Sequence, residues 1–495
     1  MGSDASASDA PGLSRFLRRA VPAMRAALRE NELSESFRED VAVADDDDAA
    51  PPECVHHLTP YPPHEDSASS RRDFWRRLVP TGVSWNATGY TLAVTYGRFD
   101  VTGWCDSPGA LCAWNLRRVD IDPHKPDHVI ETSDCLQCVA FHPEDPAVVA
   151  AGSFDGGVYV FDLGADAEGA DPLRARSGTG DASHREPVTQ VRWTRNVAEA
   201  SRASERAAAY DVVSVGSDGR AFVWNFLKMA HPAFGYDMQA PQPATGKMTT
   251  WGISCAAFGV GGWGGEDEDE DEADASGAAT ATETGAFLAG SDGGAVFRCL
   301  ASRAPAASAE FRRRCEAGDT PQMYSPVKFE YEPHAGAVHG VSVNPHDRSV
   351  FATCGADGSL RVYAQYRARR TLSMEPCDGA LFCVQWSPSR PLVVAAGTAS
   401  GRVVVYDLSK GGGDATQPTV SFGGEDEGEA PSAVHAVAFN PSLPEYLASA
   451  DASGVRVWEL GGRLRNARSN EARVLGRLAR AESPAEAAAA LAGGR

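Results

Sequence analysis

Seven short apolar stretches recur along the chain, and each ends in an aromatic residue or a valine. Asn-Pro, His-Pro or Ser-Pro often follows, which is a turn signal. A stretch of small residues then leads to a glycine-bearing turn, and a third stretch carries an aromatic residue near its end, replaced by Arg298 in the fourth copy. The first stretches end at Trp85, Phe141, Trp193, Phe258, Val343, Trp386 and Phe439. The third stretches carry Trp114, Phe161, Trp224, Tyr363, Tyr406 and Trp458.

The spacing of these copies predicts a repeat architecture. Tyr363 and Tyr406 are 43 residues apart, which matches the period of about 40 to 45 residues of WD-repeat blades. A four-stranded blade cannot bury both of its faces alone, so blades stack around an axis and each covers the next. The sequence therefore predicts an all-β, seven-bladed WD-repeat β-propeller over residues 76–462. We expect the residues just before Trp85 to supply the outer strand that closes the last blade.

Residues 1–75 differ in character and predict a short helical or disordered N-terminal extension. Apolar residues recur there at helical steps, with arginines between them, which is typical of a basic amphipathic helix. Such a helix could dock a separate protein, pack on the propeller or lie on a membrane surface. The apolar positions expected to dock a light chain are Leu13, Phe16, Leu17, Val21, Met24 and Leu28. A Pro-rich linker leads to the propeller, and residues 463–495 form an Ala/Arg-rich C-terminal tail.

Charge and composition narrow the function classes. The formal net charge of −21 is concentrated in three acidic runs, at 45–48, 266–274 and 425–429. The excess therefore belongs to loops and tails, and an acidic body without a basic stripe argues against nucleic acid as a partner. No apolar run is long enough to span a bilayer and no signal peptide is evident, so we expect a cytoplasmic protein without direct membrane insertion.

The residues that carry chemistry elsewhere are sparse here. The 11 cysteines include a single C-x-x-C, Cys135 and Cys138, and a zinc site would need a second pair of ligands. We expect reduced core thiols, no metal, no cofactor and no enzymatic activity. Trp104, in a long loop of the first blade, is a possible partner contact, although it could equally cover the end of its own blade.

Two copies carry a polar signature that resembles the blade network of WD-repeat proteins. In the third copy the residues are His184, Ser214, Asp218 and Trp224, and in the fifth they are His334, Thr353 and Asp357. The resemblance implies a hydrogen-bonded structural network, since a buried carboxylate is costly without such bonds. A hydrolase reading of Ser, His and Asp is disfavoured because no G-x-S-x-G elbow surrounds Ser214.

Several phrases resemble dynein intermediate chains, and the dynein-2 type most closely. They are Trp386-Ser387-Pro388-Ser389-Arg390-Pro391 with the strand GRVVVYDL, the run Trp85-Asn86-Ala87-Thr88-Gly89, the segment AVTYGRFD, Trp114-Asn115-Leu116, and the run from Asn344 to Tyr363. The resemblance covers about residues 80 to 460. It implies a non-catalytic subunit of the motor that carries intraflagellar transport trains back to the ciliary base, located in the cytoplasm, the cytoskeleton and the cilium. The implied partners are the dynein-2 heavy chain, a second intermediate chain, roadblock-type and other dynein light chains, and the transport trains.

Two rival functions stay open at this point. One is an intermediate chain of another dynein, axonemal or cytoplasmic. The other is a substrate receptor of a cullin ubiquitin ligase, which would carry W-D-x-R at the end of a blade. Here Trp114 is followed by Asn115 rather than Asp, which favours the dynein reading.

Overall fold

The computed structural model describes residues 20, 21, 24, 51–60, 75, 77–100, 107–167, 169–178, 183–195, 209–242, 245–258, 286–300, 321–410, 417–424 and 432–492. The chain falls into two compact units. One comprises Met1–Ala50 with Gly461–Arg463, and the other comprises Pro51–Leu460 with Leu464–Arg495. All the described strands belong to the second unit.

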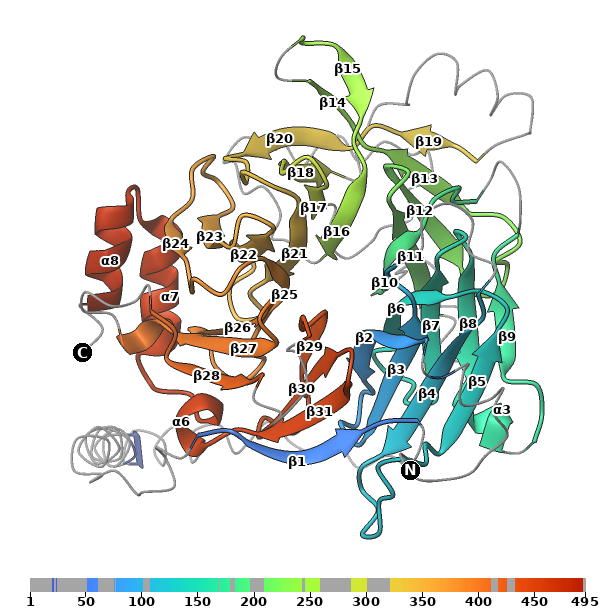
Figure 1. Ribbon diagram of the computed structural model, residues 1–495. Coiled ribbons are helices and arrows are strands. Elements are labelled where there is room, and N and C mark those ends of the chain that lie inside the picture. The colour runs from blue at the N-terminus through green and yellow to red at the C-terminus, as the bar shows by residue number, and fades with distance from the viewer. Residues whose placement is uncertain are drawn as a thin grey trace, which may run out of the picture. The chain divides into compact units, whose positions relative to one another are not determined.

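Seven sheets, each built on four antiparallel strands, form the blades of a β-propeller (Figure 1). Blade one contains β2 (Val79–Trp85), β3 (Thr91–Gly97), β4 (Gly109–Asn115) and β5 (His128–Thr132). Blade two contains β6 (Leu136–Phe141), β7 (Val148–Ser153), β8 (Val158–Asp162) and β9 (Leu173–Arg176). Blade three contains β10 (Val188–Arg195), β11 (Tyr210–Gly216), β12 (Arg220–Asn225) and β13 (Phe234–Asp237). Blade four contains β16 (Ile253–Phe258), β17 (Ala286–Ser291), β18 (Val296–Leu300) and β20 (Val327–Tyr331).

The remaining blades follow the same plan. Blade five contains β21 (Val338–Val343), β22 (Val350–Gly355), β23 (Leu360–Ala364) and β24 (Leu372–Met374). Blade six contains β25 (Leu381–Trp386), β26 (Val393–Thr398), β27 (Arg402–Asp407) and β28 (Val420–Gly423). Blade seven contains β29 (Ala436–Phe439), β30 (Tyr446–Asp451), β31 (Gly454–Glu459) and β1 (Glu53–Leu58). The first strands of successive blades are neighbours, and β2 also contacts β29, so the ring closes. The predicted seven-bladed, all-β fold is confirmed.

The markers of the sequence pattern occupy matching places in the blades. In six blades the first strand ends at the predicted marker residue, and in blade three β10 continues two residues beyond Trp193 to Arg195. The third-strand marker pairs with the second strand at an equivalent register, as in Trp224 with Val212 and Tyr406 with Val394. The turn between these strands needs a left-handed residue, and Gly219 takes it with φ +73°. A Cβ at Gly219 would also meet the Trp251 carbonyl oxygen at 2.5 Å.

The strand that closes the last blade lies farther upstream than the residues just before Trp85. β1 pairs antiparallel with β31, from Glu53 opposite Glu459 to Leu58 opposite Val455. The residues just before Trp85 form the inner strand β2 instead, so the expected propeller start at residue 76 is wrong. As an outer strand, β1 buries only Leu58 fully and exposes most of its other residues. The alternation of apolar and polar residues along β1 is therefore weak, and the prolines on either side of the strand give its sequence the look of a linker.

Two additions extend the basic plan between blades three and four. A hairpin of β14 (Gln239–Pro241) and β15 (Met248–Thr250) forms its own two-stranded sheet. The short strand β19 (Met323–Tyr324) pairs in parallel with β13 and adds a fifth strand to blade three. β19 is followed at once by β20, so two consecutive strands lie at the outer edges of two neighbouring blades, three and four.

The core lies between neighbouring blades. One cluster joins Trp85 and Trp114 of blade one with Leu58 and other residues of blade seven, and another joins Phe222 and Trp224 with residues of blade two. First-strand tryptophans also cross between blades. Trp85 Nε1 donates to the Ala438 carbonyl at 3.0 Å, and Trp193 Nε1 donates to the Ala140 carbonyl at 3.0 Å. Burying these rings removes a large apolar area from water and satisfies their single polar atom.

Helices occur beside the sheets and after them. α3 (Leu163–Ala167) follows β8, and the 3-10 helix η3 (Leu408–Lys410) follows β27. The C-terminal segment contains α6 (Gly462–Arg465), α7 (Glu471–Arg480) and α8 (Pro484–Ala492). Val474, Leu475 and Leu478 of α7 and Leu491 of α8 join the apolar cluster of blades five and six. Residues 464–492 are thus packed on the propeller.

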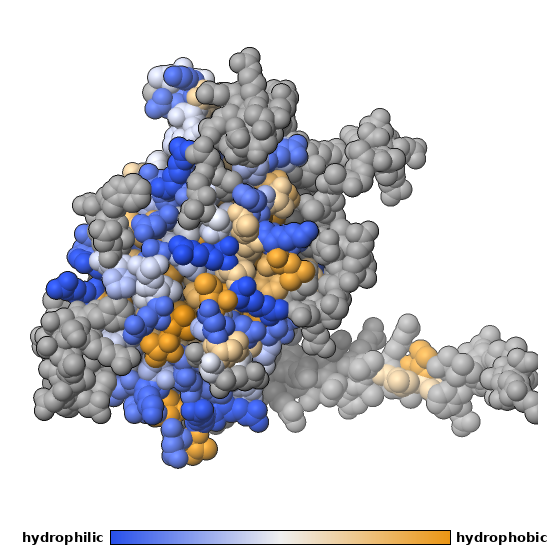
Figure 2. Space-filling model, turned by 90° about the vertical axis from the view of Figure 1, so that its right-hand side faces the viewer, coloured by the Kyte–Doolittle hydropathy of each residue, from blue (hydrophilic) through white to orange (hydrophobic). Residues whose placement is uncertain are grey.

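The surface seen in Figure 2 is the side at the right of Figure 1. Hydrophobic residues occur there in small groups among hydrophilic ones (Figure 2). Exposed hydrophobic residues scattered in this way are normal for a folded protein. Among the described residues, no helix combines the length and the apolar composition needed to cross a membrane.

Candidate functional site

The polar network of blade three is a continuous chain of four side chains. Trp224 Nε1 donates to Ser214 Oγ at 2.8 Å, and Ser214 Oγ lies 2.8 Å from His184 Nε2. His184 Nδ1 lies 3.0 Å from Asp218 Oδ1. These partners assign the ring tautomer, with Nδ1–H donating to the carboxylate and Nε2 accepting from the serine hydroxyl. The network joins the segment before β10 to β11, β12 and the turn between them.

Two effects compete at Asp218. Burial alone raises the pKa of a carboxyl group, but the hydrogen bonds from His184 and from the backbone N–H groups of Arg185 and Arg220 bring the pKa of Asp218 below its ordinary value. Asp218 is therefore ionised at neutral pH and acts as the acceptor of the network. Ser214 has no exposed surface, and its hydroxyl is already shared between Trp224 and His184. An oxygen so placed cannot attack a substrate.

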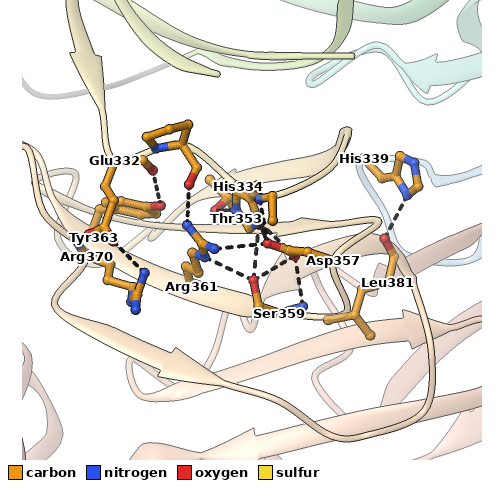
Figure 3. Close-up of polar contacts among 12 residues, drawn as sticks. Glu332, His334, His339, Thr353, Asp357, Ser359, Arg361, Tyr363, Arg370 and Leu381 are labelled. Carbon is orange, nitrogen blue, oxygen red and sulfur yellow. Dashed lines mark hydrogen bonds and ion pairs between the residues drawn. The ribbon is translucent and has the colours of Figure 1, made fainter. Parts of the chain in front are cut away.

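Blade five holds a larger version of the same network (Figure 3). His334 Nε2 lies 2.7 Å from Thr353 Oγ1, and His334 Nδ1 lies 3.0 Å from Asp357 Oδ1. Arg361 donates to Asp357 Oδ2 at 3.0 Å, to Ser359 Oγ at 3.0 Å and to the Pro333 carbonyl at 2.7 Å. The arginine thus ties β23 to the segment that precedes β21. Ser359 and Arg361 carry no signature in the sequence, because their role depends on the turn and not on the repeat.

The charges in blade five follow from these contacts. Burial lowers the pKa of His334 although Asp357 opposes it, so the imidazole is neutral at pH 7. Burial raises the pKa of Asp357, but bonds from His334 and Ser359 outweigh it and hold this pKa well below its usual range. Tyr363 stands where blade three has tryptophan, and its hydroxyl donates to the Glu332 carbonyl at 2.8 Å instead (Figure 3).

A bulge near the start of the first strand recurs around the ring. It leaves one residue out of the β-ladder, four positions before the first-strand marker, in blades one to six. Bulges re-aim a side chain without ending the strand. Several of these side chains bond to the next blade: Thr81 Oγ1 to the Leu136 carbonyl at 2.9 Å, Thr189 Oγ1 to the Ile253 carbonyl at 3.1 Å, and His339 Nδ1 to the Leu381 carbonyl at 2.9 Å.

In blades five to seven the bulge position, or its equivalent, holds a side chain with an aromatic ring. These residues, His339, Phe382 and His435, form with Phe99 what we call the aromatic band. His339 and Phe382 stack with centroids 5.0 Å apart and planes 2° apart. His435, at the same position relative to the marker of blade seven, lies 5.2 Å from Phe382 and 4.3 Å from Phe99. Burial lowers the pKa of His435, so its ring is neutral at pH 7. Phe99 is 49% exposed, which makes this aromatic band a candidate protein-binding surface.

A buried ion cluster attaches the C-terminal helices to blade six. Arg390, in the turn between β25 and β26, donates from Nη1 to Asp407 Oδ2 at 3.2 Å and from Nε to Glu471 Oε2 at 3.3 Å. Its Nη2 also pairs with Glu471. The three side chains are 0%, 0% and 2% exposed. Arg390 belongs to a phrase singled out in the sequence, but Glu471 lies 81 residues away, and no local pattern connects the two.

The expected light-chain docking residues fall mostly outside the described residues. Leu13, Phe16, Leu17 and Leu28 lie there, as does the possible contact Trp104. Val21 and Met24 are described, have helical backbone and are 38% and 60% exposed.

The described cysteines and acids make no metal centre. Within the described ranges, no group of three or more His, Cys, Asp or Glu side chains could hold a metal ion. Cys135 and Cys138 carry reduced thiols, and Cys138 Sγ donates to the Val188 carbonyl at 3.4 Å. Burial raises the pKa of Cys138 to about 12, so it is a protonated core thiol.

Comparison with known proteins agrees with this architecture. The model of the family "WD domain, G-beta repeat" matches residues 124–162 and 325–364, which cover β5 to β8 and β20 to β23. Cytoplasmic dynein 2 intermediate chain 2 of Homo sapiens is 30% identical over 91% of this chain and 76% of that protein. Its Mus musculus counterpart is 31% identical over 77% of this chain and 65% of that protein.

Intermediate chains of other dyneins are more distant. The ciliary dynein intermediate chain 2 of Heliocidaris crassispina is 25% identical over 68% of this chain and 40% of that protein. This chain covers 65% of the length of the Mus musculus dynein 2 relative and 76% of the length of the Homo sapiens one. An identity of 30% over nearly the whole chain, together with the seven-bladed fold, settles the family. The chain belongs to the dynein intermediate chain family.

Proposed function

We propose that this chain is a non-catalytic intermediate chain of a dynein-2 motor, which scaffolds the heavy and light chains for retrograde intraflagellar transport. The observation that carries the proposal is a difference between relatives. The human dynein 2 chain matches at 30% identity over 91% of this chain, whereas the ciliary and axonemal chains match at 24% to 26% over 61% to 68%. The proposed location is the cytoplasm, the cytoskeleton and the cilium with its base.

The proposed division of labour follows the two parts of the chain. The propeller grips the heavy-chain tail, and the N-terminal extension is held by light-chain dimers beside the extension of a second intermediate chain. Two tethered contacts reinforce one another, because binding at one raises the effective concentration at the other. The aromatic band is the propeller surface that we assign to the heavy chain, because partly exposed rings on a rigid base are common anchors of protein interfaces. Phe99→Ser tests that assignment without touching a blade network.

The light-chain contact is proposed for the N-terminal apolar positions. Val21 and Met24 expose apolar surface on helical backbone, which supports a helix that docks into a groove. Burying Phe16 and Leu17 in a roadblock-type dimer would contribute about 1.5 to 3 kcal/mol each. Phe16→Asp with Leu17→Asp should therefore lose the light chain and keep the heavy chain. If the double variant retains its light chains, the helix has another role.

Affinity purification of the tagged full chain from ciliated cells tests the whole proposal. A dynein-2 heavy chain, a second intermediate chain, light chains and transport-train proteins should dominate the purified material. An axonemal heavy chain would assign the chain to another dynein, and a cullin adaptor would replace the motor function by a ubiquitin-ligase function.

A further inference from the structure

One edge of this acidic chain is strongly basic. We name as the arginine patch a set of residues on α7, on the turn before it and on the turn after β23: Arg468, Arg473, Arg477, Arg480, Arg367 and Arg369. Arg367 connects the two parts, since its Nη2 donates to the Arg480 carbonyl at 3.1 Å. The exposed acids of the same helical segment are Glu482, which lies 3.5 Å from Arg367, and Glu486. The chain as a whole has a net charge of −21, so the sign of the charge reverses locally.

The sequence of α7 concentrates this charge on its exposed side. Arg473, Arg477 and Arg480 follow one another at steps of four and three residues, and all are exposed. Side chains at these steps are neighbours on a helix, and like charges there destabilise it. The one acidic residue of α7, Glu471, is buried on the opposite side against Arg390. The solvent side of α7 therefore presents three positive charges in a row, which are complementary to an anionic partner.

The patch rests on a rigid support. Val474, Leu475 and Leu478 are buried in the apolar cluster of blades five and six. Arg390 holds the first residue of the helix through Glu471. A surface whose backbone is fixed in this way loses little conformational entropy on binding. The patch is therefore suited to recognition, and we infer that it binds an acidic segment, a run of glutamate and aspartate residues, of a partner protein.

Charge and size favour a short acidic segment over other polyanions. Arginine forms paired hydrogen bonds with carboxylates, which suits aspartate and glutamate side chains. A nucleic acid or an anionic membrane extends well beyond the patch, and would approach the acidic remainder of the chain within the Debye length of about 8 to 10 Å. A short segment can stay within the patch. This inference concerns a surface distinct from the aromatic band and does not depend on the proposed motor function.

The test compares two sets of substitutions with the same change in net charge. The patch variant is Arg473→Gln, Arg477→Gln and Arg480→Gln in the full chain. The control is Lys125→Gln, Lys228→Gln and Lys247→Gln, three exposed lysines at blade one and around blade three. The probe is a fluorescent peptide of about ten glutamates, titrated by anisotropy at low and at physiological salt because exposed ion pairs are screened. Thermal melts check that each variant is folded.

The patch variant should lose at least about tenfold in affinity for the peptide, which is about 1.4 kcal/mol, while the control variant binds like the unmodified chain. Should the triple variant fail to fold, Arg369→Gln with Arg468→Gln removes charge outside the helix and should weaken binding in the same direction. Equal loss in the patch and lysine variants, or none in the patch variant, would overturn the inference. So would arginine-dependent binding of a single-stranded oligonucleotide or phosphatidylserine vesicles that is tighter than that of the peptide.

Discussion

Replacing Arg390 by methionine should release the C-terminal helices from blade six. The substitution preserves a long apolar stem but leaves Asp407 and Glu471, which are 0% and 2% exposed, without their cation. Asp407 keeps hydrogen bonds from Ser409, whose backbone N–H lies 3.0 Å from Oδ1. Glu471 is therefore the carboxylate that must either take up a proton or leave the interior with α7.

The loss of stability of the α7 contact can be worked out from the first of these routes, protonation of Glu471. Protonating a glutamate of ordinary pKa, about 4.3, at pH 7 costs about 3.7 kcal/mol. This falls within the range of about 3 to 5 kcal/mol known for breaking a buried ion pair from one side. Protonation also makes the loss of stability depend on pH, because lowering the pH by one unit reduces the cost of protonating the glutamate by about 1.4 kcal/mol. We expect a loss of about 4 kcal/mol at pH 7 and about 1 kcal/mol at pH 5.

Hydrogen exchange of the α7 amides measures this local opening directly. A loss of about 4 kcal/mol corresponds to an increase of several hundredfold in the opening equilibrium of α7. Arg468→Met is the matched control, because that arginine lies on the same segment but is exposed and should change protection little. A loss below about 1 kcal/mol at pH 7, or one that does not change with pH, would refute the reasoning.

Asp218→Ala removes the acceptor of His184 in blade three and should cost about 1 to 3 kcal/mol; an unchanged melting temperature would contradict this. Removing residues 1–59 deletes β1 and exposes the edge of β31, so the shortened chain should aggregate in light scattering, whereas one that starts at residue 51 should stay monodisperse. Burial lowers the pKa of His334. The imidazole of His334 therefore becomes protonated at a higher pH in the unfolded chain than in the folded one, and the free energy of unfolding decreases as pH falls below about 6.5. His334→Gln should therefore narrow the difference between urea midpoints at pH 7.5 and 5.5, and an unchanged difference would count against this account of His334.

The sequence predicts the blades well because their markers serve the same physical role in each copy. A first strand lies on the inner ring and buries an aromatic or branched residue against its neighbour, so Trp85, Trp386 and Phe439 recur at the ends of strands. β1 escapes prediction because an outer strand has one solvated face, and its alternation is too weak to stand out. Even there the fold needs a partner for β31, which an unclosed blade would leave as an exposed edge.

The candidate surfaces are predicted less well, because they depend on residues that the fold brings together from distant positions. The aromatic band joins Phe99 to His435, which belong to opposite ends of the propeller sequence. Its bulge members could have been found by comparing the residue four positions before each marker, where threonine, glutamine and serine give way to histidine and phenylalanine. Glu471 offers no such signal, since its partner is fixed only once α7 packs on blade six.

The blades differ most in how they use the same bulge position. Where this position holds threonine, as at Thr81 and Thr189, the hydroxyl donates a hydrogen bond to a carbonyl of the next blade and so stabilises the propeller. His339 makes the same bond with one ring nitrogen and still stacks on Phe382, so it serves the fold and the surface together. At Phe382 and His435 the rings contact one another, and Phe99 remains half exposed at the end of the row. The first strands of neighbouring blades contact one another along their length, and this closure does not depend on the side chains of Phe99, Phe382 and His435. We therefore expect substitutions at these three positions to change a partner contact and to leave the fold intact.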